Sequence, residues 1–290
     1  MLDLDATDIP LHGHQEARFF HGYYDSYCYL PLYIFAGDQL LCARLRPADQ
    51  DGAAGSVEEV ERIVSQIRQR WPRVQIIVRA DSGFCREELM HWCEDHRVDY
   101  VLGLARNERL RKLLDQQMQE ARQQNEATGK AARVFTEFGY RTHKSWSRSR
   151  RVIAKAEYLP GKENPRFVVT SLAGGEPQPL YEKLYCARGE MENRIKEQLC
   201  LFADRLSTET MRANQLRLYF SAMAYTLLEA LRRLALQGTE WAQAQVDTLR
   251  LRLLKIAAQV QISARRIWLR YNGAYPWQAI FRHAWAALRC

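Results

Sequence analysis

Several common signatures are missing from this sequence of 290 residues. Its seven cysteines form no Cys-x2-Cys pair and no other metal-ligand spacing, so we expect free thiols in a reducing cytoplasm. The absence of a Gly-rich phosphate loop means that nothing points to nucleotide hydrolysis. No hydrophobic run is long enough to span a membrane, and no charged-then-apolar leader precedes the first predicted strand. We therefore expect a soluble protein of the cytoplasm.

Acidic residues are scarce in the last part of the chain. From Arg205 to Cys290 there are 13 Lys or Arg and only 4 Asp or Glu, a local balance of +9. This segment alone accounts for the net charge of +8 of the whole chain. The overall composition, 47% hydrophobic and 26% charged, is that of an ordinary globular protein. A basic surface of this kind suits a polyanion such as DNA.

Hydrophobic periodicity predicts an α/β fold. The short turn at Gly37-Asp38 indicates that the strands on either side of it pair antiparallel. Three antiparallel-type strands, then a helix, strand, helix, strand and helix, is the order of a ribonuclease-H-like mixed sheet with flanking helices. The predicted strands cover residues 2–7, 28–37, 40–47, 74–81 and 99–105, and the predicted helices cover 56–70, 86–96 and 108–126.

The pattern changes along the chain and predicts four regions. Residues 1–131 form the first part of the core, and 132–175 form a β-rich insertion with strand-like runs at 132–140, 150–158 and 166–172. Residues 176–207 hold a core helix, and 208–290 form a helical, basic C-terminal tail.

Three acidic residues dominate the candidate site. Asp5 lies in the strand-like run LDLDAT, and Asp81 ends the buried run IIVRAD before a Ser-Gly turn. The end of a buried strand is where α/β sheets place ligand-binding residues. Glu192 lies on a predicted helix, and the three carboxylates can converge on one or two divalent metals. The structural alternatives are a solvent-facing Asp5 and an Asp81 that caps the next helix.

The helix around Glu192 has a distinctive face. At about 100° per residue, Tyr185, Arg188, Glu192 and Lys196 fall on roughly one side of it. An ion pair between Arg188 and Glu192, four residues apart, is also compatible with this spacing.

The segments DLDAT, RADSGF and YCARGEMENRIKEQ resemble the three catalytic motifs of DDE transposases from bacterial insertion sequences. More narrowly, they resemble the group with a Tyr-x2-Arg-x3-Glu-x6-Lys signature. Tyr185, Arg188 and Glu192 match its first three positions, and Leu199 occupies the position of its Lys. Lys196, one turn earlier on the same face, is the candidate substitute.

The resemblance implies a chemistry for these residues. Asp5, Asp81 and Glu192 would be catalytic and would bind two Mg²⁺ ions, with Mn²⁺ as a possible replacement. Asp3 and Asp8 are rivals to Asp5, which is preferred because Asp5-Ala6-Thr7 matches the Asp-x-Thr motif of the family. The reaction would be metal-dependent strand cleavage at the ends of an insertion sequence, followed by strand transfer into target DNA.

The resemblance also implies partners. DNA, both transposon ends and target, would be bound by a homodimer in the bacterial cytoplasm, associated with the nucleoid. Tyr185, Arg188 and Lys196 would contact the DNA backbone. Because Met1 stands only four residues before Asp5, we expect the N-terminal DNA-binding domain of the family to be missing.

A basic cluster is the second candidate DNA contact. Residues 138–156 contain no Asp or Glu, and Trp146 lies among their basic side chains. Basic side chains neutralise phosphates while an exposed indole stacks on an unpaired base. The alternative is a solvated hairpin with Trp146 packed against the core. The basic residues assigned to DNA here are Lys144, Arg148, Arg150 and Arg151.

Other features leave alternatives open. His12 and His14 flank Gly13 near Asp5, but loop histidines without a metal are commoner than metal ligands. The C-terminal run LRLRLLKIAAQVQISARRIWLR could lie on DNA or form a solvated amphipathic helix. Two rival functions also remain: a ribonuclease-H-like nuclease or resolvase, and a truncated, non-catalytic remnant that binds DNA or inhibits a full-length transposase.

Overall fold

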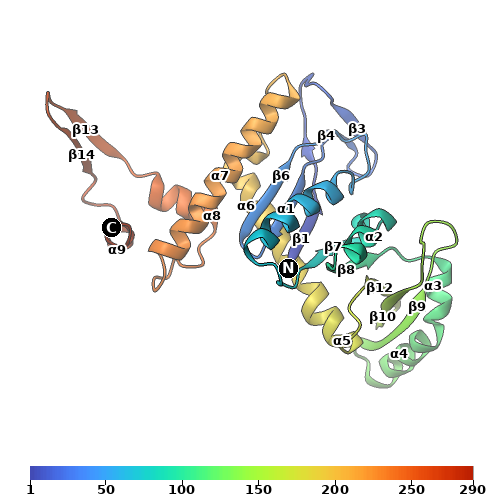
Figure 1. Ribbon diagram of the computed structural model, residues 1–290. Coiled ribbons are helices and arrows are strands. Elements are labelled where there is room, and N and C mark those ends of the chain that lie inside the picture. The colour runs from blue at the N-terminus through green and yellow to red at the C-terminus, as the bar shows by residue number, and fades with distance from the viewer. Residues whose placement is uncertain (290) are drawn as a thin grey trace.

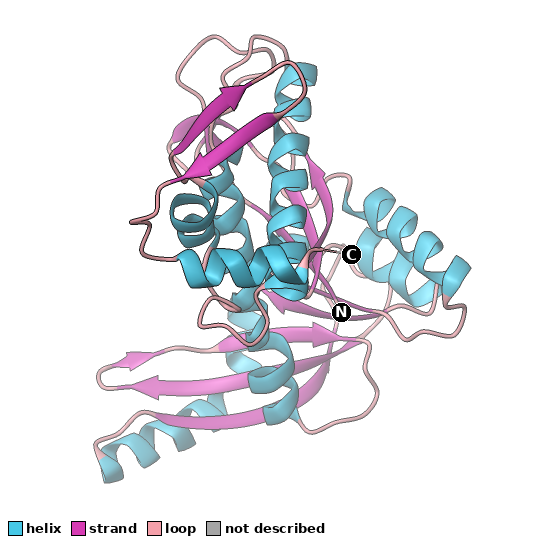
Figure 2. Ribbon diagram, turned by 90° about the vertical axis from the view of Figure 1, so that its left-hand side faces the viewer, coloured by secondary structure: helices cyan, strands magenta, loops and turns pink. Residues whose placement is uncertain are grey.

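The computed structural model describes residues 1–289, so the free thiol predicted at Cys290 lies outside the described residues. A large sheet forms the centre of the body, the long helix α7 lies along one side of it, and a C-terminal arm projects beyond α7 (Figure 1). Figure 2 shows helices on both sides of the strands.

The central sheet is mixed and has nine strands. Its order is β11-β10-β12-β8-β7-β1-β5-β6, and β9 pairs with β10. The pairs β1–β5 and β5–β6 are antiparallel, whereas β1–β7 and β7–β8 are parallel. The strands are β1 (Leu2–Ala6), β5 (Leu32–Ala36), β6 (Gln39–Arg44), β7 (Ile77–Ala80), β8 (Asp99–Leu104), β9 (Ala132–Tyr140), β10 (Arg150–Leu159), β11 (Lys162–Glu163) and β12 (Arg166–Thr170).

Two smaller sheets lie outside it. One has the order β2-β4-β3, and the other is the hairpin β13–β14 in the C-terminal arm. Their strands are β2 (Ile9–Pro10), β3 (Phe19–His21), β4 (Ser26–Tyr29), β13 (Ala258–Ile262) and β14 (Ile267–Tyr271).

The helices vary widely in length. Short 3₁₀ or π turns precede or follow several of them. The α-helices are α1 (Ser56–Arg70), α2 (Glu87–Asp95), α3 (Glu108–Leu113), α4 (Asp115–Thr128), α5 (Pro177–Pro179), α6 (Gly189–Gln198), α7 (Met211–Ala235), α8 (Val246–Leu249) and α9 (Gln278–Ala287). The turns are η1 (Ser82–Phe84), η2 (Leu180–Tyr185), η3 (Cys186–Arg188), η4 (Leu199–Ala203) and η5 (Arg250–Leu254).

Side-chain alternation along the strands builds a separate core on each face of the sheet. Leu2 and Leu4 of β1 pack in the core that includes residues of α1 and α2. Tyr33 and Phe35 of β5 pack on the other face with residues of α6 and α7. Asp3 and Asp5 alternate with Leu2 and Leu4, and so they lie on the face opposite α1.

Helix α1 has the predicted bounds, and its apolar stripe is buried. Val60, Ile63 and Val64 recur at helical spacing and pack on the sheet. Ser56 is the first residue of this helix. Gly55 occupies the cap position at a φ of 73°, which glycine adopts more readily than other residues.

The predicted β-rich stretch at 132–175 continues the central sheet. Strand β12 pairs antiparallel with β8 over Phe167–Thr170, and β10 lies between β12 and β9. The stretch is therefore joined to the core by main-chain hydrogen bonds rather than by a linker.

The predicted helical region 208–290 contains α7, α8 and α9, but the prediction is wrong for residues 258–271. Residues 258–271 form the hairpin β13–β14. Val260, Ile262 and Ile267 are β-branched and alternate with other residues, which favours a strand over a helix. The spacing of apolar and Arg residues alone did not distinguish the two.

The cysteines and the apolar character of the helices can be compared with the sequence analysis. Each of the six cysteines that the structure describes is a free thiol. Among residues 1–289, no helix combines the length and the apolar character that crossing a membrane requires.

Candidate active site

Two of the three predicted acidic residues lie on neighbouring parallel strands. Asp5 is in β1, and Asp81 directly follows β7 in an extended conformation. The register pairs Leu4 with Ala80, so the next residue on each strand is an aspartate. Parallel strands bring equivalent ends to the same edge of a sheet, and the two carboxylates therefore lie side by side.

The third acidic residue, Glu192, is linked to the two aspartates by ion pairs with a shared arginine. Glu192 is in α6, and Arg188 comes one turn earlier, in η3. Arg188 Nη2 lies 2.9 Å from Asp5 Oδ2 and 3.9 Å from Asp81 Oδ2. Arg188 Nη1 lies 3.2 Å from Glu192 Oε1. All three carboxylates thus converge on one guanidinium, and the predicted Arg188–Glu192 ion pair is present.

Burial differs among the three carboxylates. The Asp5 side chain is 13% exposed, whereas Asp81 and Glu192 are 44% and 53% exposed. The pKa of Asp5 is raised from 3.8 to about 6, chiefly by burial and also by the negative charges of Asp81 and Glu192, while Arg188 opposes the rise. A buried carboxylate with two acidic neighbours is stabilised by positive charge, which is the environment that a cation-binding site requires.

Asp81 has two contacts rather than one. Its Oδ1 accepts a hydrogen bond of 2.8 Å from the N–H of Gly83 and so caps the turn η1. Its Oδ2 faces Arg188. The capping alternative from the sequence is therefore present together with the convergence on Arg188.

Tyr185 reaches the same edge of the sheet. A Cβ atom added at Gly103 of β8 would lie 2.5 Å from Tyr185 Oη and 2.9 Å from the Ser82 nitrogen. Only glycine lets the tyrosine and the loop after Asp81 approach β8 this closely. Burial raises the pKa of Tyr185, so its hydroxyl stays protonated and can donate a hydrogen bond.

Neither rival of Asp5 contacts this cluster. Asp3 forms a buried double hydrogen bond with Arg79, at 2.5 Å from Oδ1 and 2.8 Å from Oδ2. Arg79 also donates to the carbonyl oxygen of Leu184, just before Tyr185. Among the described residues, no hydrogen bond or ion pair involves Asp8. Asp3 and Arg79 therefore hold β1, β7 and η2 together beneath the cluster.

Among the described residues, no hydrogen bond or ion pair joins Lys196 to the three carboxylates, although it lies one turn after Glu192 on α6. It is exposed on α6 and lines a cavity of about 470 Å³ together with Glu197, Arg232 and Gln245. Leu199, at the position of the signature Lys, packs partly buried against the core on that face of the sheet. The role of Lys196 as a substitute for the Lys remains a prediction.

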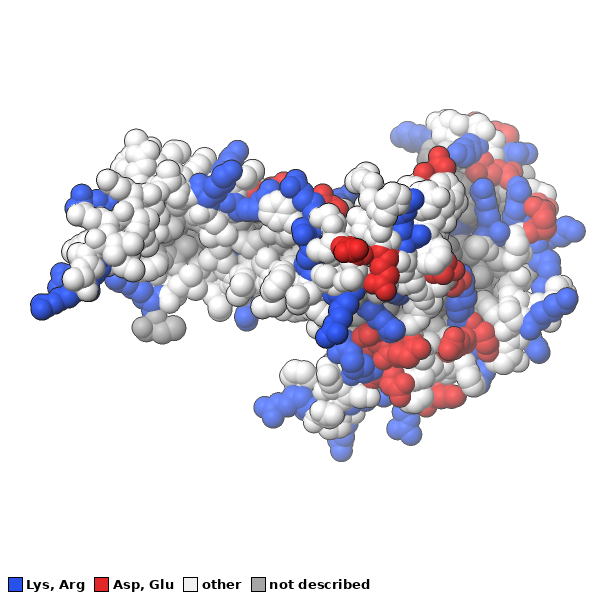
Figure 3. All heavy atoms as spheres, turned by 90° about the horizontal axis from the view of Figure 1, so that it is seen from above, with Lys and Arg blue, Asp and Glu red and all other residues white. Residues whose placement is uncertain are grey.

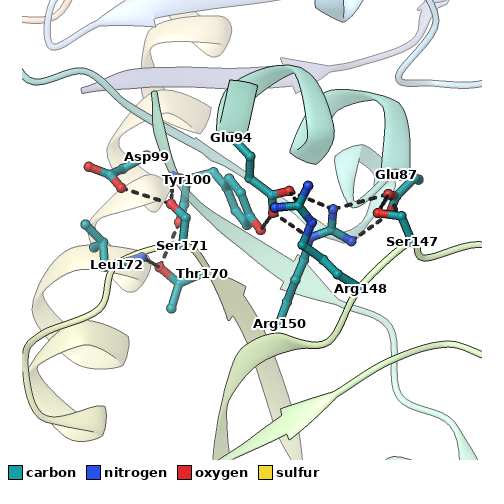
Figure 4. A network of polar contacts seen from close by, with 10 residues as sticks. All are labelled: Glu87, Glu94, Asp99, Tyr100, Ser147, Arg148, Arg150, Thr170, Ser171 and Leu172. Atoms are coloured by element: carbon teal, nitrogen blue, oxygen red, sulfur yellow. Dashed lines mark hydrogen bonds and ion pairs between the residues drawn. The ribbon is translucent and has the colours of Figure 1, made fainter. Parts of the chain in front are cut away.

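The structure corrects two residues of the predicted basic cluster. Trp146 is 5% exposed and packs edge-on against Tyr140, with ring centroids 5.7 Å apart. Arg150 is also buried, and it donates to Glu87 and Glu94 of α2 at 2.6 Å each. Figure 4 shows Arg150 beside the carboxylates of Glu87 and Glu94 of α2. Neither Arg150 nor Trp146 is exposed on the surface.

The other cluster residues differ in their availability. Arg151 pairs with Glu137 and donates to the carbonyl oxygens of Leu172 and Gly174, so it holds a loop. Arg148 is about half exposed and lies 3.4 Å from Glu94. Lys144 is exposed. Of the four basic residues assigned to DNA in this cluster, Arg148 and Lys144 remain candidates for contact with phosphates.

A second basic surface was not singled out from the sequence. A cavity of about 790 Å³ adjoins the site at Ser82, Gly103 and Tyr185. Glu163 also lines it, and one of its lysines is paired with Glu157. Its four basic residues come from position 106 and from within residues 155–166, where they are separated by neutral and acidic residues, so no continuous basic run marks the surface. They are Arg106, Lys155, Lys162 and Arg166.

Acidification is expected to weaken the fold through Glu87. Burial raises the pKa of Glu87, but hydrogen bonds from Arg150 and Ser147 lower it more, from 4.5 to about 2. Because the pKa is depressed, the stabilisation is present above pH 4.5 and is lost as the pH falls from 4.5 toward 2. The ionised Glu87 side chain contributes at most about 3 kcal/mol to the free energy of unfolding. Urea unfolding at several pH values should show a shallower acid loss for Glu87→Gln; equal slopes would contradict the expectation.

Comparison with known proteins places the chain in a family. A family model described as "Transposase DDE domain group 1" matches residues 1–290. The chain belongs to the DDE transposase domain family. The resemblance predicted from the three motifs is thereby confirmed at the level of this family. No curated protein matches the chain.

Solved structures with a similar fold include that of a transposase. It is the cryo-EM structure of a piggyBac transposase synaptic complex with hairpin DNA, at a TM-score of 0.50 and 11% sequence identity. The match covers 86% of this chain and 50% of that chain, so the DDE domain spans about half the length of that transposase. At this identity the likeness concerns the fold alone.

Proposed function

We propose that this chain is the catalytic domain of a DDE transposase that cuts DNA strands and joins the resulting 3′ ends to target DNA. One observation carries the proposal: Asp5, Asp81 and Glu192, each on a different element, converge on Arg188 at 2.9 to 3.9 Å. Membership of the DDE family supports it, since the family name refers to three such acidic residues.

We infer that the core is ribonuclease-H-like. The strands β6, β5, β1, β7 and β8 lie side by side in this order, antiparallel on one side of β1 and parallel on the other. This agrees with the succession of elements that suggested the fold from the sequence. On this basis residues 132–175 are an insertion that extends the sheet, and 176–207 return to the core.

A divalent metal fits the chemistry of the site. Among residues 1–289, no group of three or more His, Cys, Asp or Glu side chains is close enough to hold a metal as it stands. The three carboxylates nevertheless surround one positive charge, and withdrawal of Arg188 would leave hard oxygen donors facing each other. Mg²⁺ bound there, or Mn²⁺ in its place, would activate the nucleophile and stabilise the leaving 3′-oxygen.

The chain's own residues would position the DNA. Arg188, once released from the carboxylates, holds a phosphate through its planar donor fork. The Tyr185 hydroxyl donates to the same backbone, and Lys144 and Arg148 neutralise phosphates farther along. The substrates on this proposal are transposon ends and target DNA, bound by a homodimer. An insertion sequence in a bacterial cell, with the protein on the nucleoid, is the context that the motifs suggest.

Plasmid nicking tests this proposal. The purified chain is incubated with supercoiled plasmid and Mg²⁺ or Mn²⁺, beside Asp81→Asn, which keeps an oxygen for the Gly83 N–H, and Asp95→Asn, an exposed control on α2. We expect metal-dependent nicking by the wild type and Asp95→Asn but not by Asp81→Asn. Nicking by all three would indicate a contaminant or a mistaken site. Nicking by none would favour the non-catalytic remnant.

A second assay separates a transposase from a nuclease or resolvase of the same fold. Oligonucleotides with a free 3′-hydroxyl are added to the same reactions. Joining of labelled oligonucleotide to plasmid is expected from a transposase, whereas hydrolysis without joining would favour the nuclease.

A further inference from the structure

The C-terminal hairpin has two chemically different faces. Its register places Val260 opposite Leu269 and Ile262 opposite Ile267, so these four side chains share one face. Ala258 and Tyr271 extend the same face. Gln259, Gln261, Trp268 and Arg270 occupy the other. We call the first set the apolar face of the hairpin: Ala258, Val260, Ile262, Ile267, Leu269 and Tyr271.

Within the described chain, the apolar face is contacted at one end, where Tyr271 packs against Phe281 of α9 with ring centroids 5.3 Å apart, and its remaining side chains stay exposed. All ten residues of β13 and β14 are exposed, and Ile262 is 74% exposed. The arm projects away from the body (Figure 1). A hairpin of two strands is only marginally stable in water by itself. Exposing β-branched side chains to water on one face is unfavourable and lowers its stability further.

Helix α7 carries a second uncovered apolar surface. Its inner side is buried in the core through Leu218, Tyr225 and Leu228. On the opposite side, side chains recur every three to seven residues and lie within about 40° of one line at 100° per residue. Each of them is more than half exposed. We call this set the outer stripe of α7: Leu216, Phe220, Met223, Leu227 and Leu234.

We propose that a second copy of this chain covers both surfaces, with the hairpin of each copy lying across the outer stripe of the other copy's α7. A two-fold symmetric pair makes this contact twice. Both copies of the apolar face of the hairpin and of the outer stripe of α7 are then covered. Packing hairpin on hairpin alone would leave the outer stripes bare, and packing α7 on α7 alone would leave the hairpins bare.

The available area supports a stable dimer. Five large side chains of the outer stripe, each more than half exposed, offer about 500 Å², and the apolar face of the hairpin offers a similar area. Together these contribute roughly 1,000 Å² per copy, which exceeds the ~800 Å² per partner of a typical stable interface.

Charge is compatible with this arrangement. The chain has no Asp or Glu after Asp247, and the arm is therefore purely basic. Arg270 lies on the polar face of the hairpin, and Arg265 and Arg266 lie in the turn beyond the strands. Arg266 lies over the ring of Trp268, so both it and Arg270 are on the polar face and outside the proposed contact. Figure 3 shows Lys and Arg side chains at the outer end of the arm, where the dimer leaves them free for a polyanion.

Sedimentation velocity on the full chain, without DNA or metal, tests the contact. We expect the wild type to be dimeric at micromolar concentration. Ile262→Asp on the hairpin and Phe220→Asp on α7 should each weaken the dimer at least tenfold, whereas Gln261→Asp on the polar face should leave it unchanged. A monomeric wild type, or dimers indifferent to both apolar substitutions, would overturn the proposal.

Mixing the two variants separates arm exchange from other dimers. In a mixed dimer, the intact hairpin of Phe220→Asp can lie on the intact stripe of Ile262→Asp, so one of the two contacts survives. We expect the mixture to dimerise at concentrations where neither variant does alone. Absence of this rescue would reject the exchange, and an unfolded variant could not produce it. Because the test needs no DNA cleavage, its outcome is independent of the proposed chemistry.

Discussion

Replacing Asp5 by Asn is expected to reduce metal-dependent plasmid nicking by roughly 10³-fold or more. Asp5 is the most buried of the three converging carboxylates and lies 2.9 Å from Arg188. The amide keeps the size of the side chain and its acceptor for the Ala6 N–H, but it removes the negative charge that a divalent ion needs. Nicking is measured as initial rate against Mg²⁺ concentration.

The two neighbouring aspartates serve as matched controls. Asp8→Asn should leave the nicking rate within about twofold, because no contact joins Asp8 to the cluster. Asp3→Asn should act on stability instead, since it leaves the buried Arg79 without its charged partner and costs roughly 3 kcal/mol. A large loss of nicking in Asp8→Asn with full activity in Asp5→Asn would show that the site has been assigned to the wrong residue.

Replacing Arg150 by Met is expected to lower the free energy of unfolding by about 3–5 kcal/mol. Arg150 is buried, donates to both Glu87 and Glu94, and lies over the ring of Trp146. Methionine fills much of the volume but removes the buried cation that Glu87 and Glu94 share, and only the half-exposed Arg148 then remains near Glu94. Urea unfolding at pH 7 measures the change.

Arg148→Met is the control for this variant. Arg148 is about half exposed and touches the same Glu94 at 3.4 Å, so its loss should cost less than about 1 kcal/mol. If Arg148→Met destabilised the protein as much as Arg150→Met, the buried network would not be the source of the effect. Weaker DNA binding with unchanged stability in Arg150→Met would instead restore Arg150 as a DNA contact.

Elements with a strong local pattern were predictable. The buried stripe of α1 and the alternation in β9 gave bounds that match the structure, Ser56–Arg70 and Ala132–Tyr140. The three acidic motifs were also visible in the sequence, because each lies in a short run with its own signal. Asp81 ends a buried run before a Ser-Gly turn, and Arg188 precedes Glu192 by one helical turn.

Features that depend on distant partners were not predictable. The sequence does not distinguish Arg148, Arg150 and Arg151, yet Arg150 alone of the three is buried between Glu87 and Glu94, which are 63 and 56 residues away. Those carboxylates turn a presumed phosphate contact into a buried ion pair. The same limit applies to Asp3, since its partner Arg79 is 76 residues away.

The sequence by itself determined the family, the three acidic motifs and most elements of the sheet, because these depend on neighbouring residues and on short periodicities. Only the tertiary structure decided which of the charged side chains remain free. Burying a charge is costly unless an opposite charge is brought to it, and strand order and helix packing determine which charges meet. For the same reason, the convergence of Asp5, Asp81 and Glu192 on Arg188 is a property of the fold.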